Sequence, residues 1–118
     1  MLYIKIGEKK WPARYSLRAA MEVEDKYGGV KKALFEQTET PSAQIRARIC
    51  VLHELLMAGK AWAELEEGKT AEEPPSEEQL LDMIASAKSG EIMEQMIRAI
   101  NDDEHADFEA EVQEGKNP

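Results

Sequence analysis

The chain has 118 residues, of which 33% are charged, and its formal net charge is −9. This length fits one domain. No run approaches the roughly 18 apolar residues that a membrane-spanning helix needs, so we expect no membrane partner. The single cysteine, Cys50, excludes an internal disulfide and, with no secretory signal expected at the N-terminus, predicts a reduced cytoplasm as the location.

The charge is distributed unevenly along the chain. Residues 1–60 contain 11 Lys and Arg and 7 Asp and Glu, whereas residues 61–118 contain 4 and 17. A non-specific nucleic-acid binder is expected to be basic on its contact face. The charge of the whole chain therefore argues against a nucleic-acid partner, and we expect the acidic second half to act as a solubilising surface.

The N-terminal segment predicts a β-hairpin over residues 2–12. Apolar side chains alternate with other side chains over residues 2–6, which is the period of a half-buried strand. A turn and a return strand to Trp11 follow. Because Pro12 cannot donate a ladder hydrogen bond, it is expected to end this strand or to lie on a sheet edge.

Two helices are predicted after the hairpin. Ser16 is a favourable N-cap for the first helix, which ends near Tyr27 because Gly28 accepts the left-handed backbone of a helix end. A short second helix covers residues 30–37. The apolar stripe of the first helix is expected to contain Leu17, Ala20 and Met21, and Val23 and Tyr27 are expected to broaden it.

A long central helix is predicted to begin at Thr40 and Pro41, which fit the N-cap and the first helical position. Helical spacing of apolar residues continues beyond Gly59. Glycine inside a helix costs only about 1 kcal/mol, so the sequence leaves open whether the helix ends there or passes through. The clearest stripe of this helix consists of Ile45, Ile49, Leu52 and Leu56.

The second half begins with a polar, flexible linker over residues 68–75. Ser76 and Gln79 form a capping box for a short helix. A final amphipathic helix ends near Ile100, and residues 102–118 are predicted to be an acidic, disordered tail. The chain is thus predicted to be mainly α, with one domain over residues 1–101 that contains about five helices and the N-terminal hairpin.

A search for catalytic chemistry finds no supporting pattern. His53 and Glu54 lack the second histidine of a zinc-binding HExxH helix, since position 57 is Met. There is no phosphate loop and no nucleophile elbow, and Cys50 between two apolar residues predicts a buried, inert thiol. We therefore expect no enzyme activity, no catalytic residue, no cofactor and no metal. The weaker alternative is a metal site in the acidic tail, from Asp102, Asp103, Glu104, His105 and Asp107.

Three side chains are candidates for binding a protein partner: Trp62, Met93 and Met96. Thioethers pack well against irregular or changing surfaces, and an exposed tryptophan is a common anchor at interfaces. The competing interpretation is that these residues fill a core that has few aromatic side chains.

The order of the predicted elements follows a recognisable pattern. A short hairpin leads into a capped helix that starts at Tyr15-Ser16-Leu17 and closes with Glu24-Asp25-Lys26-Tyr27-Gly28-Gly29. A long apolar helix ending at Leu55-Leu56-Met57-Ala58-Gly59, a proline-serine linker and two short helices follow. Over roughly residues 1–101, this order resembles the tail assembly chaperones of long-tailed bacteriophages and related prophages.

The resemblance implies a small helical protein of the bacterial host cytoplasm that is absent from the mature virion. It implies two partners, the phage tape-measure protein, which the chaperone keeps soluble, and the tail-tube protein, which it helps to recruit. In many phages a ribosomal frameshift extends the chaperone, and the protein sequence does not indicate whether this happens here. No binding motif is carried over from the family to individual residues.

Three alternatives stay open at this point. The acidic second half would suit a DNA mimic that inhibits a DNA-binding protein, because carboxylates can copy the spacing of phosphates. A structural tail-completion or head-completion protein that remains in the virion is the second alternative. A small metal-dependent enzyme is the third.

Overall fold

A computed structural model describes the backbone of residues 2–116 and the side chains of residues 2–103. Its N-terminal part is an antiparallel hairpin of β1 (Leu2–Ile6) and β2 (Lys9–Ala13), with Ile4 opposite Trp11. One face of the hairpin is buried, and Pro12 lies within the second strand. The predicted hairpin is confirmed and extends to Ala13.

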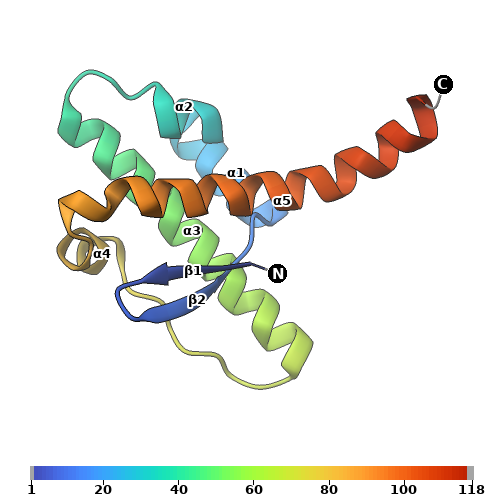
Figure 1. The fold of residues 1–118 in the computed structure, drawn as a ribbon, viewed down its shortest axis with the longest axis horizontal. Helices are drawn as coiled ribbons and strands as arrows, with labels where there is room; N and C mark the ends of the chain where they lie inside the picture. The colour runs from blue at the N-terminus through green and yellow to red at the C-terminus, as the bar shows by residue number, and fades with distance from the viewer. Residues whose placement is uncertain (1, 117–118) are drawn as a thin grey trace.

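Five α-helices and one short 3-10 helix follow in the described part of the chain (Figure 1). The predicted fold class, mainly α with an N-terminal hairpin, is therefore confirmed. The long helix α3 lies at the centre and contacts α1, α2, α4 and α5. The helices are α1 (Leu17–Tyr27), α2 (Val30–Phe35), α3 (Pro41–Glu67), α4 (Glu77–Met83), η1 (Ser86–Lys88) and α5 (Ser89–Lys116).

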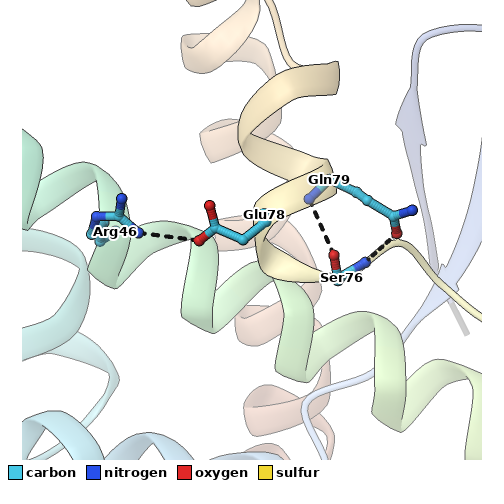
Figure 2. Close-up of polar contacts among 4 residues, drawn as sticks. All are labelled: Arg46, Ser76, Glu78 and Gln79. Carbon is cyan, nitrogen blue, oxygen red and sulfur yellow. Dashed lines mark hydrogen bonds and ion pairs between the residues drawn. The ribbon is translucent and has the colours of Figure 1, made fainter.

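Helix caps account for where α1, α3 and α4 begin. The Ser16 and Thr40 hydroxyls accept hydrogen bonds from the N–H groups of Ala19 and Ala43, at 3.1 and 3.0 Å. Figure 2 shows the capping box of α4, in which the Ser76 hydroxyl accepts from the Gln79 N–H and the Gln79 side chain accepts from the Ser76 N–H. All three starts agree with the sequence, because a cap depends on residues within one turn.

The central helix α3 passes through Gly59 without a break, which settles the point that the sequence left open. A Cβ atom on Gly59 would lie 1.9 Å from the carbonyl oxygen of Pro12, so only glycine fits where β2 crosses the helix. One residue beyond β2, the Arg14 N–H donates to the carbonyl of Leu55, at 3.1 Å. The crossing therefore brings two backbones into direct contact.

Helix α1 is rotated relative to the sequence prediction. Leu17 and Met21, predicted to face inward, are 86% and 64% exposed, whereas Ala19 and Val23 are buried. Positions 19 and 23 also have helical spacing, and their smaller side chains let α1 pack closely against α3. The sequence prediction was therefore wrong for Leu17 and Met21, whereas Val23 is buried and Tyr27 packs against the core, as expected for the broadened stripe.

The segment 68–75 contains no helix or strand, but it is held against the body. The Ala71 N–H donates to the Glu64 carboxylate at 2.9 Å, and Lys60 forms an ion pair with Glu73 at 3.3 Å. Lys9 of the hairpin also forms an ion pair with Glu72, and Pro74 and Pro75 are buried. The contacts of this segment are with residues that are distant in sequence, which local sequence patterns did not indicate.

Helix α5 ties the second half of the chain to the hairpin. The Gln95 amide accepts from the Lys5 N–H at 2.8 Å and donates to the Lys5 carbonyl at 3.3 Å, which satisfies the outer edge of β1. The Asp103 carboxylate accepts from the Tyr15 N–H at 2.7 Å. Contacts between α5 and the first part of the chain thus extend to Asp103.

The backbone of α5 continues as a helix to Lys116, whereas the sequence predicted a helix end near Ile100. The prediction of a separate acidic tail over residues 102–118 falls mostly on residues 104–118, whose side chains lie outside the described part of the chain. So do three of the five residues of the alternative metal site.

We predict that Gly59→Ala lowers the free energy of unfolding by about 1–3 kcal/mol, because the new methyl group forces β2 away from α3. This range is the net effect, because the cost of displacing β2 exceeds the roughly 1 kcal/mol by which alanine is more favourable than glycine in a helix. Gly90→Ala in α5 is the matched control, since its Cβ meets no atom within 4 Å. Urea unfolding of the three proteins measures both effects, and equal stability of Gly59→Ala and the wild type would contradict the crossing.

Candidate functional site

A partly open apolar cavity of about 280 Å³ lies between α3, α4, η1 and the start of α5. We call it the α3–α4–α5 groove. Nine of its twelve lining residues are apolar, so it offers little to a charged or strongly polar ligand. The apolar lining residues are Ile45, Ile49, Leu52, Leu80, Leu81, Ile84, Ile92, Met93 and Met96, and the others are Arg48, Ser86 and Ser89.

The short helix α4 forms one wall of the groove. Its capping box sets where the helix begins, and Leu80 is completely buried against the core. Arg46 of α3 and Glu78 of α4 form an ion pair across the two helices, at 3.3 Å (Figure 2). Both side chains are largely exposed, so this pair contributes little stability.

The floor and the rim of the groove differ in exposure. Met96 and Leu80 on the floor are 2% and 0% exposed, whereas Ile45 on the rim is 52% exposed. The Arg48 side chain is also fixed at the rim, because its Nε donates to the Leu34 carbonyl at 2.8 Å. Such a groove can bury one or two apolar side chains of a partner helix and hold the rest of that helix at its rim.

The structure brings together two of the three predicted partner-binding residues. Met93 is half-buried at the groove, and Met96 belongs to the core and reaches the groove only at its floor. Trp62 lies on α3 about 15 Å further along the helix than the groove residue Leu52 and lines a different cavity. There the Arg14 guanidinium lies over its ring, 3.9 Å from the ring centre. That these residues bind a partner stays a prediction.

Sequence reasoning assigned the other groove residues to the core. Ile45 was placed on the inward stripe of the central helix, but it lies at the rim of the groove and is 52% exposed. The sequence contained a signal for Leu81 and Ile84, because their helical spacing after Leu80 indicates an apolar side of this short helix. The sequence did not indicate that they would meet Met93 across a groove.

The buried thiol of Cys50 lies beside Lys26, which also pairs with Glu54. Cys50 is 3% exposed, and burial is the main cause that raises the pKa of its thiol. Lys26 Nζ lies 3.9 Å from the Cys50 sulfur and 3.6 Å from a Glu54 carboxylate oxygen. The pKa of Lys26 is raised, chiefly by its interaction with Cys50 and secondly by that with Glu54. A thiol that resists ionisation is a poor nucleophile.

No group of three or more His, Cys, Asp or Glu side chains in the described part of the chain could hold a metal ion. Within the same part, the helices are too short or too polar to cross a membrane.

Comparisons with protein-family models, with curated proteins and with solved structures find no match to this chain.

We predict that the Cys50 thiol reacts with a disulfide reagent at pH 8 at least about tenfold more slowly in the native protein than in the denatured chain. Burial blocks the access of the reagent, and the raised pKa of the thiol lowers the fraction present as thiolate. Following the absorbance of the released thiolate, with and without denaturant, measures both rates. Equal rates would mean that the thiol is accessible in the native state.

Proposed function

We propose that the protein is a bacteriophage or prophage tail assembly chaperone that binds the tape-measure protein and helps to recruit tail-tube subunits in the bacterial host cytoplasm. The α3–α4–α5 groove is the observation that carries the proposal. It supplies a partly open apolar surface next to a well-packed core. The order of the elements, which resembles this family, agrees with the proposal.

The chemistry of the client explains why such a groove would be useful. A tape-measure protein is long, and during synthesis it exposes apolar helical faces that would otherwise aggregate. A helix of this kind presents apolar side chains one turn apart, which is the arrangement that a narrow apolar groove accepts. The exposed Ile45 and the half-buried Met93 provide the contact, while the buried floor keeps its shape.

The net charge supports the same role. A chain with a formal charge of −9 repels other copies and other acidic proteins, which keeps a complex with an apolar client in solution. The apolar groove supplies the attraction, and the acidic surface supplies the solubility.

We predict that Ile45→Asp reduces recovery of the co-expressed tape-measure protein in the soluble complex by about tenfold or more. A tenfold loss of affinity corresponds to about 1.4 kcal/mol. Burying a carboxylate in an apolar contact costs at least this much. Met83→Asp is the matched control, because Met83 is 49% exposed, compared with 52% for Ile45, and does not line the groove. Met96 is unsuitable as a test position, since a charge there would disrupt the core.

Circular dichroism must show that both variants fold. Undiminished recovery by a folded Ile45→Asp variant would contradict the groove as the binding site, and no recovery by the wild type would contradict the proposed function itself.

We also predict that mass spectrometry of purified phage particles does not find this chain, because a chaperone leaves before the tail is complete. The tail-tube protein in the same sample is the positive control. A stoichiometric amount of the chain in the particles would favour the structural tail-completion alternative.

A further inference from the structure

Among the described residues that line the α3–α4–α5 groove, Arg48 of α3 is the one charged side chain. The other lining residues are nine apolar side chains and two serines, so no carboxylate belongs to this described lining. Arg48 also forms no ion pair with a carboxylate in the part of the chain whose side chains are described. On a protein of net charge −9, the apolar groove thus carries a positive charge that no described carboxylate neutralises.

The acidic side chains of the elements around the groove lie outside its lining. Those of α4, of the start of α5 and of the loop before α3 are Glu77, Glu78, Asp82, Glu91, Glu94, Glu36 and Glu39. Three of them pair with other cations, since Glu78 pairs with Arg46, Glu91 with Lys88 and Glu94 with Arg98. A partner that enters the groove therefore meets the guanidinium and no carboxylate of the described lining.

Two contacts hold the Arg48 guanidinium at the rim of the groove. Its Nε donates to the Leu34 carbonyl of α2 at 2.8 Å, and its Cζ lies 5.9 Å from the centre of the Phe35 ring. A guanidinium carries several N–H donors, and the others of Arg48 form no further hydrogen bond to the described residues. The side chain is thus held in place while most of its donors are available to a ligand.

Arg48 lies next to the exposed apolar contact of the groove. Ile45 precedes it by three positions on α3, which places both side chains on the same side of the helix, and Ile45 is 52% exposed. Three residues of α-helix span about 4.5 Å, less than one turn. A partner helix that places an apolar side chain on Ile45 therefore brings its adjacent turn over Arg48.

A partner that covers Arg48 must replace the water around its N–H groups. A covered cation without an acceptor loses its hydration, which opposes binding. A carboxylate on the partner restores the charge balance, and a guanidinium can bind it through two parallel hydrogen bonds. A lysine or arginine at the same place would add repulsion. Apolar helices of otherwise equal fit are thus distinguished by the residue that they place over Arg48.

We propose that Arg48 determines the specificity of the groove by selecting client helices with an Asp or Glu about one turn from the apolar side chain that contacts Ile45. This proposal rests on the proposed function, because the client helix is a segment of the tape-measure protein. The pair between the guanidinium and the carboxylate fixes the position of that helix along the groove, whereas the apolar lining supplies the attraction.

Overlapping peptides that cover the tape-measure protein of the same phage or prophage test the selection, with fluorescence anisotropy measuring their binding to the full purified chain. The peptide that binds most tightly should contain an Asp or Glu one turn from apolar residues, and Arg48→Glu should bind it at least about tenfold more weakly. Replacing that acidic residue of the peptide by Lys should weaken binding to the wild type by a similar factor.

Lys10→Glu is the matched control. It changes the net charge by the same amount at an exposed position of β2 that does not line the groove. Because a charge outside the contact is screened by salt, this variant should bind the peptide within about twofold of the wild type.

The exchanged pair is the decisive sample. Arg48→Glu should bind the Lys-substituted peptide more tightly than the wild type does, which a misfolded variant could not do, and circular dichroism checks the fold separately. The proposal is overturned if this gain is absent, or if Arg48→Glu binds the original peptide as the wild type does. Self-association of the wild type that Arg48→Glu abolishes would identify a second copy as the occupant and would also overturn it.

Failure of this proposal and failure of the proposed function give different results. If the peptides bind the wild type and Ile45→Asp weakens them but Arg48→Glu does not, the groove holds the client without selecting an acidic residue, and only the role of Arg48 is wrong. If neither the peptides nor the co-expressed tape-measure protein bind the wild type, the proposed function is wrong and the role of Arg48 fails with it.

Discussion

The close crossing of β2 over α3 at Gly59 is the contact on which the rest of the structure depends. The Pro12 carbonyl occupies the space of the missing side chain, and the Arg14 N–H adds a hydrogen bond to the Leu55 carbonyl. A two-stranded hairpin is marginal by itself, so it needs a surface to cover. Once it lies on α3, its outer edge receives α5 through Gln95, and the first and last parts of the chain become one body.

The same crossing divides α3 into two functional halves. Because Gly59 lets the helix continue, α3 extends beyond the hairpin at both ends. Its first half, with α4 and α5, builds the α3–α4–α5 groove, and its last part, with α1, builds the cavity that Trp62 lines. We propose a client for the first of these two surfaces.

Features that depend on neighbouring residues were predictable, and features that depend on distant partners were not. The hairpin and the caps at Ser16, Thr40 and Ser76 follow from a few residues each. The orientation of α1 did not, because two apolar stripes compete along that helix and only packing against α3 selects the smaller one. The groove was missed for the same reason, although Met93 had been identified as a candidate.

The sequence by itself determined the fold class, the starts of three helices, the uneven charge and the inert setting of Cys50, since composition and local spacing are sufficient for these. Only the tertiary structure decided that α3 continues through Gly59 and that segment 68–75 contacts the body. It also decided that Met96 belongs to the core while Ile45 is exposed, and that Trp62 lies apart from Met93 and Met96. Each of these depends on which surfaces meet, and contacts between residues far apart in the chain leave no periodic signal in its sequence.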